Sequence, residues 1–526
     1  MAEDFKFGAN ILENLTTGMY RNPLVLYREY IQNACDSIDK AVNSGLLSSA
    51  KDGHIEIWLD IDSRSIEITD NGTGISEADF ERVLGNIADS EKTLGEDKGF
   101  RGIGRLCGLA YCDRLEFHSK FAGENVVSIL SCDAKKMRNL LNLHQSKQKR
   151  YLAGDILNEI YLFEKKNTSD IDEHYFKVKL CEVNSLSNDI LDIPSIKEYL
   201  SFVAPVSYQN SFIFRQKIYE HSQCLGVTID EYSLKINGED IFKKYVTVLK
   251  DKNGQKSDDI EDILFKEFYD NERKLIAWMW IGVHQFKGVI PKNNLMRGLR
   301  LRKENIQIGD EDALQKLFKE DRGNSYFIGE VFAIDKNLIP NSQRDYFNQN
   351  VSREEFENAL KLYFNDLYKT YHYASSLNSG YKKIERFETL QAEFVETART
   401  GFAGIEHRET KEIELKEAEQ AARKAQKEIE KMVEKAATGA PLLDTVAKII
   451  QKKRASNRSE PKQDLSTSIT DDVNDTHKKP TWRVDKLTRL SKQERKLVGR
   501  IFDVIFSATD NETAESIVVK IEEALK

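Results

Sequence analysis

The sequence predicts an α+β fold for its first part, because a helix pattern is followed there by strand patterns of antiparallel character. Residues 23–43 have the apolar spacing of one helix, with Pro23 in its first turn, where a missing N–H costs least. "HIEIWLDID" and "SIEITD" then alternate apolar and polar residues around a short polar turn, as in an antiparallel hairpin. Helices beside an antiparallel sheet are typical of a two-layer domain, which we expect over residues 1–190.

The character of the chain changes further along. Residues 195–372 mix helix and strand patterns again, so we expect a second α/β domain there. Residues 380–453 are rich in Glu, Lys and Ala with apolar residues at helical spacing, which predicts a long exposed helix or a short coiled coil. A solvated helix packed on its own domain is the alternative. Residues 454–484 are polar, as in a flexible linker, and residues 485–526 predict a tethered helical hairpin.

Composition limits the class of protein. The 526 residues have a formal net charge of -8 with 31% charged residues, which gives no support for a surface that binds nucleic acid over its whole area. An apolar run of about 18 residues is absent from the sequence, and the acidic start "MAEDFKFGAN" has no signal-peptide pattern. The 6 cysteines form no CxxC pair. We expect a cytoplasmic protein with reduced thiols and no membrane span.

The first candidate site lies on the helix "YREYIQNACDSIDK". Glu29, Asn33 and Asp36 are spaced so that they share one stripe of this helix. A carboxylate beside a carboxamide suits a general base next to a magnesium ligand. For this motif alone, an ordinary polar helix face is the simpler explanation.

The second candidate site is "TDNGTGI", where Asp70 ends a strand pattern and Gly72, Gly74 and Ile75 follow. A carboxylate in this place can accept a hydrogen bond from an exocyclic amine, and glycines let the backbone approach a flat ring closely. A plain turn after a strand is the alternative.

The third candidate site is the glycine-rich stretch "DKGFRGIGRLCG", which precedes an apolar helical segment. Backbone N–H groups at such a place can bind phosphates. No Gly-Lys-Ser or Gly-Lys-Thr closes the stretch, and no parallel βαβ unit surrounds it, so it is neither a P-loop nor a dinucleotide fingerprint. Its candidate phosphate-binding residues are the glycines Gly99, Gly102 and Gly104.

In this order and spacing, the three motifs resemble those of the GHKL ATPase superfamily, which includes Hsp90 chaperones, MutL, type II topoisomerase ATPase subunits, MORC proteins and sensor histidine kinases. The whole chain is most similar to a stand-alone prokaryotic Hsp90-like ATP-binding protein. The resemblance implies a Bergerat-type two-layer α/β sandwich over residues 1–190, a transducer-like α/β middle domain and a helical C-terminal region. It also implies ATP and Mg²⁺ as ligands and hydrolysis of ATP to ADP and phosphate.

The resemblance assigns roles to single residues. Glu29 would activate the hydrolytic water, Asn33 would bind Mg²⁺ and Asp70 would recognise the adenine amine. Residues 85–101 would form a lid over ATP. The remaining implied nucleotide-binding positions are Asp36, Gly72, Gly74, Ile75, Lys98, Gly99, Arg101, Gly102, Ile103 and Gly104. The family usually has a Gly-Thr pair on a late strand near adenine, and "EHYFKVKL" lacks it, so the resemblance supports base specificity less than phosphate chemistry.

A second catalytic residue is implied in the middle domain. "DKNLIPNSQRDYFNQN" resembles the Hsp90 loop whose Arg approaches the γ-phosphate, which points to Arg344. A cation there would stabilise charge on the transferring phosphoryl group. Lys292 in "IPKNNLMRG" is the competing candidate, since MutL and gyrase-type proteins use a Lys from a transducer loop. A structural role for Arg344 is the remaining alternative.

Two functions follow from the resemblance. The first is an ATP-driven clamp, expected to be a homodimer, that acts on a protein partner or client through the helical C-terminal region. Association suggests a bacterial antiviral defence system as its setting. The second is an ATP-gated DNA clamp of the MutL or MORC type, favoured by the basic runs "PKNNLMRGLRLRK" and "KIIQKKRASNR" and opposed by the net charge. A switch that binds ATP and barely hydrolyses it is a third, simpler possibility.

Overall fold

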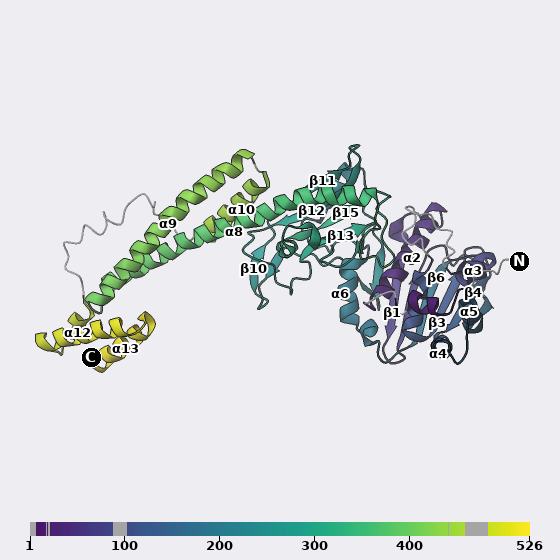
Figure 1. Cartoon of the computed structure of the whole chain (residues 1–526), viewed down its shortest axis with the longest axis horizontal. Helices are drawn as coiled ribbons and strands as arrows, with labels where there is room; N and C mark the ends of the chain where they lie inside the picture. The colour runs from purple at the N-terminus through teal and green to yellow at the C-terminus, as the bar shows by residue number, and fades with distance from the viewer. Residues whose placement is uncertain are drawn as a thin grey trace. The chain divides into compact units, whose positions relative to one another are not determined.

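The computed structural model describes residues 7–16, 18, 22–87, 102–439, 441–457 and 482–525. It divides into two compact units, which are described separately. The first comprises Met1–Val283 and Val289–Asp366, and the second comprises His284–Gly288 and Leu367–Lys526. Figure 1 shows the elements of both. Within the described ranges, we find no helix that is both long and apolar enough to span a membrane.

The first unit contains an eight-stranded sheet with the strand order β5-β4-β3-β6-β2-β1-β7-β8. The expected antiparallel hairpin is confirmed, with Ile57 opposite Ile68. Buried residues alternate with more exposed ones along β1 and β2, so one face of the sheet receives the helices. The strands are β1 (His54–Asp60), β2 (Ser65–Asp70), β3 (Cys112–Lys120), β4 (Val126–Asp133), β5 (Tyr161–Asn167), β6 (Tyr175–Val183), β7 (Ser233–Ile236) and β8 (Glu239–Asp240).

Short and long helices pack against this sheet and complete the α+β domain. They are α1 (Asn10–Leu15), α2 (Val25–Asn43), α3 (Glu77–Gly85), α4 (Ala134–Gln145) and α5 (Ala153–Ile160), with 3-10 segments η1 (Ala50–Asp52) and η2 (Gly104–Ala110). The two-layer α+β arrangement expected from the sequence is therefore confirmed.

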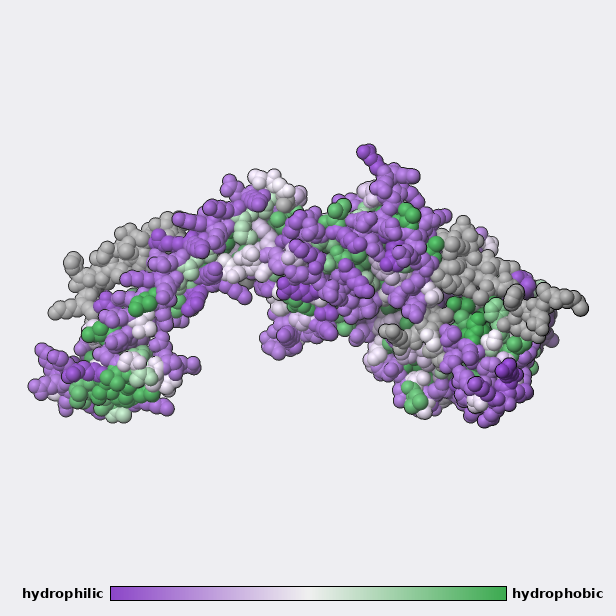
Figure 2. Space-filling model, in the orientation of Figure 1, coloured by the Kyte–Doolittle hydropathy of each residue, from purple (hydrophilic) through white to green (hydrophobic). Residues whose placement is uncertain are grey.

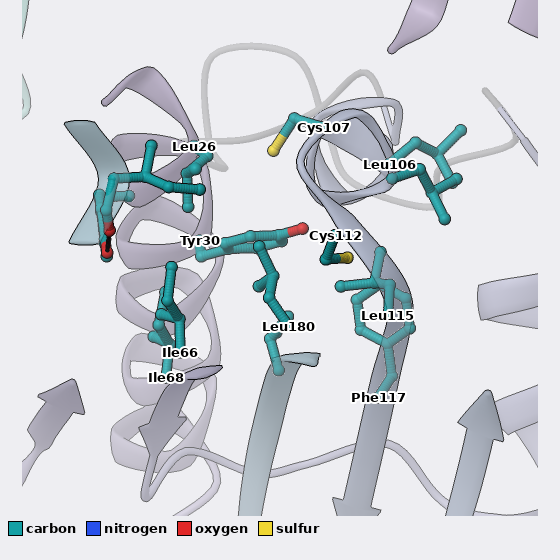
Figure 3. Close-up of a cluster of buried hydrophobic side chains, with 14 of the residues drawn as sticks. Leu26, Tyr30, Ile66, Ile68, Leu106, Cys107, Cys112, Leu115, Phe117 and Leu180 are labelled. Carbon is teal, nitrogen blue, oxygen red and sulfur yellow. Dashed lines mark hydrogen bonds between the residues drawn. The ribbon is translucent and has the colours of Figure 1, made fainter. Parts of the chain in front are cut away.

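Tyr30 of α2 joins the helix layer to the glycine-rich segment. Figure 3 shows its ring between α2 and the apolar side chains of the sheet, with the hydroxyl directed toward η2. That hydroxyl donates to the carbonyl of Arg105 at 3.0 Å and accepts from the N–H of Gly108 at 3.1 Å. The two hydrogen bonds fix α2 relative to η2 and so position the residues that precede and follow Tyr30.

The first sheet extends beyond the expected boundary at residue 190. "YSLKINGEDI" was expected in the second domain, but its strands β7 and β8 belong to the first sheet, where β7 runs parallel to β1. Along the chain, β6 is followed by η3 (Asn188–Leu191), α6 (Ile193–Val203) and α7 (Arg215–Cys224) before β7 begins. Apolar alternation identifies a strand but does not say which sheet it joins.

A second, five-stranded sheet follows in the first unit, with the order β11-β12-β15-β13-β14. The strands expected in "KLIAWMWIGVHQF" and "GLRLRKENIQIG" are confirmed. The sheet comprises β11 (Asp262–Tyr269), β12 (Leu275–Val283), β13 (Gly298–Lys303), β14 (Ile306–Ile308) and β15 (Ile328–Ala333); a separate pair is formed by β9 (Val248–Lys250) and β10 (Lys256–Asp259), and η4 (Gln315–Leu317) and η5 (Asp321–Tyr326) lie between β14 and β15.

The second unit is helical. The expected long helices are confirmed as α8, which begins in the first unit, and α9, with 50 and 35 residues. The expected break near Gly439 and Pro441 lies between α9 and α10. The helices are α8 (Val351–Thr400), α9 (Ile405–Gly439), α10 (Pro441–Asn457), η6 (Arg483–Lys486), α12 (Lys492–Ala508) and α13 (Asn511–Leu525). Residues 458–481 of the expected linker lie outside the described ranges.

The helical hairpin α12–α13 is confirmed, and it is docked rather than merely tethered. Phe502 and Phe506 pack with Ala403, which lies in the turn between α8 and α9. His407 at the start of α9 stacks on Phe506 with ring centroids 4.3 Å apart. Other apolar side chains of α12, including Leu497, remain exposed. Figure 2 shows a hydrophobic patch over these C-terminal helices.

Candidate functional site

The site begins with the stripe on α2. Glu29 is 7% exposed and Asp36 is also buried, whereas Asn33 between them is half-buried. They project from one face of a 19-residue helix that Tyr30 holds on η2. Since Glu29 and Asp36 are buried on this face, they do not belong to a solvated polar surface. The polar-face explanation is therefore wrong for Glu29 and Asp36.

The glycine-rich segment meets this stripe at Gly104. A Cβ atom added at Gly104 would lie 2.5 Å from Oε2 of Glu29, so a side chain cannot be accommodated without moving the carboxylate. Gly102 has a φ of +68°, in the left-handed region that favours glycine. Ile103 links the two glycines and is half-buried. Lys98, Gly99 and Arg101 lie outside the described residues, as do residues 88–101 of the expected lid.

Two arginines contact the same oxygen of Glu29. The Nη2 atom of Arg28 lies 3.3 Å from Oε1, and the Nε atom of Arg344 lies 3.5 Å from it. Arg28 also donates to the carbonyl of Gln343 at 3.2 Å. The loop around Arg344, expected from the sequence to reach the site, therefore does reach Glu29. Lys292, the competing cation, is exposed and lies beside Arg344 in the lining of a neighbouring cavity.

Asp70 forms the other end of the site. It is 4% exposed at the end of β2, and its Oδ1 accepts a hydrogen bond from the N–H of Gly72 at 2.9 Å. A Cβ at Gly72 would clash with the hydroxyl of Ser37 on α2. Gly74 has a φ of +66°, and a Cβ there would clash with the carbonyl of Lys120. The two glycines are thus required by close approach and by backbone conformation, beyond an ordinary turn.

The strand beside Asp70 is β6, which lacks a Gly-Thr pair. Phe176 of β6 lies directly opposite Asp70 of β2, and Ser119 of β3 lies opposite Phe176. The Phe176 ring is tilted against Phe117 with centroids 6.1 Å apart. The hydroxyl of Ser119 is hydrogen-bonded to both backbone groups of Ile75, at 2.6 and 2.9 Å. An aromatic side chain and a hydroxyl therefore follow Asp70 across the sheet.

Sequence reasoning missed three contributors to this site. Arg28 immediately precedes Glu29, but helical periodicity gives no sign that its cation is buried beside that carboxylate. Phe176 and Ser119 become visible only when the antiparallel register of three strands is known. The strand "EHYFKVKL" offered one indication of Phe176. Its side chains alternate between the two faces of the sheet, and Phe176 shares a face with the buried Val178.

Comparison with known proteins agrees with the motifs. Residues 26–157 match the family described as "Histidine kinase-, DNA gyrase B-, and HSP90-like ATPase". The chaperone protein HtpG of Orientia tsutsugamushi (strain Boryong) is 24% identical over 390 residues, which cover 68% of this chain and 52% of that protein. HtpG of Psychrobacter arcticus is 34% identical over 134 residues, covering 22% of this chain and 20% of the relative. HtpG of Streptomyces coelicolor is 30% identical over 144 residues, covering 23% of each.

The chain therefore spans about half the length of the HtpG of Orientia tsutsugamushi. The family match covers the region that contains α2, the β1–β2 hairpin and η2. In this region the chain is similar to the Hsp90-like ATPases of the GHKL superfamily.

Proposed function

We propose that the chain binds ATP with Mg²⁺, hydrolyses it to ADP and phosphate, and uses the cycle to drive a dimeric clamp that acts on a protein partner. One observation supports this proposal above the others: the buried Glu29 carboxylate lies between Gly104 of the glycine-rich segment and Arg344 of the second region. This proximity supports the assignment of Glu29 as general base, of the glycine-rich backbone as phosphate binder and of Arg344 as the cation.

Each residue has a chemical part in this proposal. Glu29 accepts a proton from the attacking water, and the N–H groups after Gly102 and Gly104 hold phosphate oxygens. Asn33 offers an amide oxygen to Mg²⁺, which would neutralise charge on the phosphates when bound. Asp70 accepts a hydrogen bond from the adenine amine.

Arg344 has two possible anionic partners in this proposal. In the structure it is paired with Glu29. A γ-phosphate at the glycine-rich segment would compete with Glu29 for the guanidinium group, because phosphate oxygens fit its fork of donors. Arg344 would then stabilise the transferring phosphoryl group, and Glu29 would be released toward water.

A protein partner is favoured over DNA by the burial of the basic runs. In "PKNNLMRGLRLRK", the side chains of Arg300, Arg302 and Lys303 are buried in β13 and are not presented to a phosphate backbone. In the second run, Arg454 is paired with Glu385. The dimeric clamp, the client and the defence setting rest on the resemblance and stay predictions.

The proposal is tested by ATP turnover of Glu29→Ala and Asp70→Ala. We expect Glu29→Ala to lose turnover by roughly 10²–10⁴-fold and to retain nucleotide binding, because only the general base is removed. Asp70→Ala should lose nucleotide binding itself. Glu81→Ala, on the exposed side of α3, is the matched carboxylate control. Wild-type turnover in Glu29→Ala would refute hydrolysis at this site.

The partner is tested by capture from the native host. Glu29→Ala, with ATP and Mg²⁺ present, should retain its partner, and Asp70→Ala should not. A defined protein enriched only with Glu29→Ala supports the protein clamp. Nuclease-sensitive DNA in that fraction supports the DNA clamp instead, and identical captures from both variants exclude ATP gating.

A further inference from the structure

A cavity of about 840 Å³ lies beside the candidate ATPase site, within the first unit. We name it the junction cavity, because its walls come from the start of α2, from α6, and from the loops around β13, β14 and Arg344. Its volume falls within the range of small-molecule sites, which occur preferentially where domains meet. Glu29, Asn33 and Asp70 do not line it, but Arg344 does, so the cavity adjoins the nucleotide site proposed above.

The buried charges of the junction cavity are all positive. Arg28, Arg300 and Arg344 line it and are each at least nine-tenths buried. The carboxylates in its lining are all exposed; they are Glu198, Asp310, Glu311 and Asp345. The inner wall is therefore cationic, and the negative groups lie where water already solvates them.

Of the three buried arginines in this lining, Arg300 has no anionic partner within the described part of the chain. Arg28 and Arg344 are both paired with Glu29. Among the residues that the structure describes, Arg300 donates only to neutral groups, the side-chain oxygen of Gln307 at 2.9 Å and the carbonyl of Leu295 at 2.5 Å, and its Nε has no hydrogen-bond partner. Its guanidinium carbon lies 4.2 Å from the centroid of the Phe202 ring.

Burying an unpaired guanidinium group is costly, since its hydration is lost and no opposite charge compensates. A guanidinium group that is stacked on an aromatic ring and faces a cavity is a suitable group for binding phosphate or carboxylate oxygens. We infer that the junction cavity binds a small anion, with Arg300 at its floor and Arg297 and Lys292 nearer to solvent. The ligand is a small molecule with a phosphate or carboxylate group.

The inference is tested by thermal unfolding of the full chain with inorganic pyrophosphate or citrate as the anion, in buffer with EDTA and without Mg²⁺. An anion that binds only the folded state raises Tm in proportion to its occupancy. We expect at least one of the two anions to raise the Tm of the wild type. Arg300→Met should reduce that shift strongly, because the apparent affinity for the anion falls by about tenfold or more.

Arg300→Met also separates a binding role from a structural one. Without ligand, its Tm should equal or exceed that of the wild type, because an apolar side chain replaces an uncompensated charge. If the variant does not fold, the double variant Lys292→Met with Arg297→Met reports on the solvent side of the cavity and should weaken the shift. Arg322→Gln, an exposed arginine elsewhere in the unit, is the matched control and should leave it unchanged.

The nucleotide site is distinguished by Gly102→Ala, in the segment proposed to hold phosphate oxygens, which should keep the anion-dependent shift. A shift that is lost in Gly102→Ala and kept in Arg300→Met would place the anion in the nucleotide site and overturn the inference. Absence of any shift with both anions would overturn it as well. Neither result bears on ATP turnover, which is measured separately with Glu29→Ala.

Discussion

Arg344 occupies an unusual backbone position for a cation that meets a carboxylate. Its φ is +54°, in a region that costs a non-glycine residue of the order of 1–3 kcal/mol. Three hydrogen bonds impose this conformation: its N–H donates to Asn341, its carbonyl accepts from Gly309, and Asn341 in turn donates to Tyr346. The surrounding loop therefore maintains a strained backbone that directs the guanidinium group toward Glu29.

A comparison of Arg344→Ala with Arg344→Gly tests this assignment. Both variants remove the cation, so turnover should fall by about 10²–10³-fold, as for loss of one preorganised charge in a phosphoryl-transfer site. Arg344→Gly should be the more stable of the two by about 1 kcal/mol, because glycine adopts positive φ without strain. Steady-state ATPase assays and denaturant unfolding provide the measurements. Turnover unchanged in both variants would leave Arg344 a structural residue.

At this scale, the sequence was informative where a role demands a fixed spacing. Glu29, Asn33 and Asp36 could be placed on one stripe because helix geometry is regular. The burial of Arg28 could not be predicted. It results from contact with a loop more than three hundred residues later, and such a contact leaves no periodic signal in the helix sequence.

Among the elements, β13 shows how a basic sequence becomes part of a core. Arg302 is fully buried and paired with Glu330 of the neighbouring strand β15, and Lys243 lies 3.3 Å from the same carboxylate. Burial raises the pKa of Glu330, but the charges of Arg302 and Lys243 and the hydrogen bonds of its carboxylate outweigh burial and lower the pKa to about 2.

Glu330→Gln should therefore destabilise the first unit strongly. Removing the carboxylate leaves the buried Arg302 cation uncompensated, at a cost of about 3–5 kcal/mol at pH 7. The lowered pKa stabilises the folded state fully above the unfolded carboxyl pKa of about 4.3, and this contribution is lost as the pH falls toward 2. The difference between the wild type and Glu330→Gln should thus shrink over that window. Glu320→Gln at a more exposed position is the control, and an equal effect of both substitutions would contradict the assignment.

The docked hairpin provides a second element-scale prediction. Burial lowers the pKa of His407 to about 4, and its Nδ1 accepts a hydrogen bond from the N–H of Ala403. Unfolded histidine becomes protonated near pH 6.5, whereas docked His407 stays neutral. Docking is therefore fully stabilised above pH 6.5 and weakens as the pH falls toward 4.

Hydrogen exchange of α12 and α13, corrected for intrinsic rates, should show reduced protection at pH 5 relative to pH 7.5. In His407→Asn, which retains an acceptor for Ala403 but does not titrate, protection should be independent of pH over this range. Equal pH dependence in the variant and the wild type would show that another group controls docking.

For the whole molecule, the proposed clamp predicts ATP-dependent association. Glu29→Ala with ATP and Mg²⁺ should sediment as a dimer, because the nucleotide-bound state accumulates when hydrolysis is blocked. Asp70→Ala should sediment as its nucleotide-free form under the same conditions. A sedimentation coefficient that is the same for both variants, with and without ATP, would contradict a nucleotide-gated dimer.

At this scale, the chain order of helices and strands could be predicted well, and their grouping less well. The break at Gly439 and Pro441 was visible because both residues interrupt helices. The sheet to which β7 belongs could not be predicted, because pairing between distant segments depends on the packed sheet and leaves no local signal in the sequence.

That distant pairing affects how the chain must be synthesised. One edge of β1 pairs with β2. The other edge pairs with β7, which the ribosome produces only after α6 and α7. At about 5–20 residues per second, roughly ten seconds or more pass with this edge uncovered. Unpaired edges recruit strands from other chains. A fragment ending at residue 190 leaves this edge uncovered and should consequently aggregate more than the full chain in light scattering.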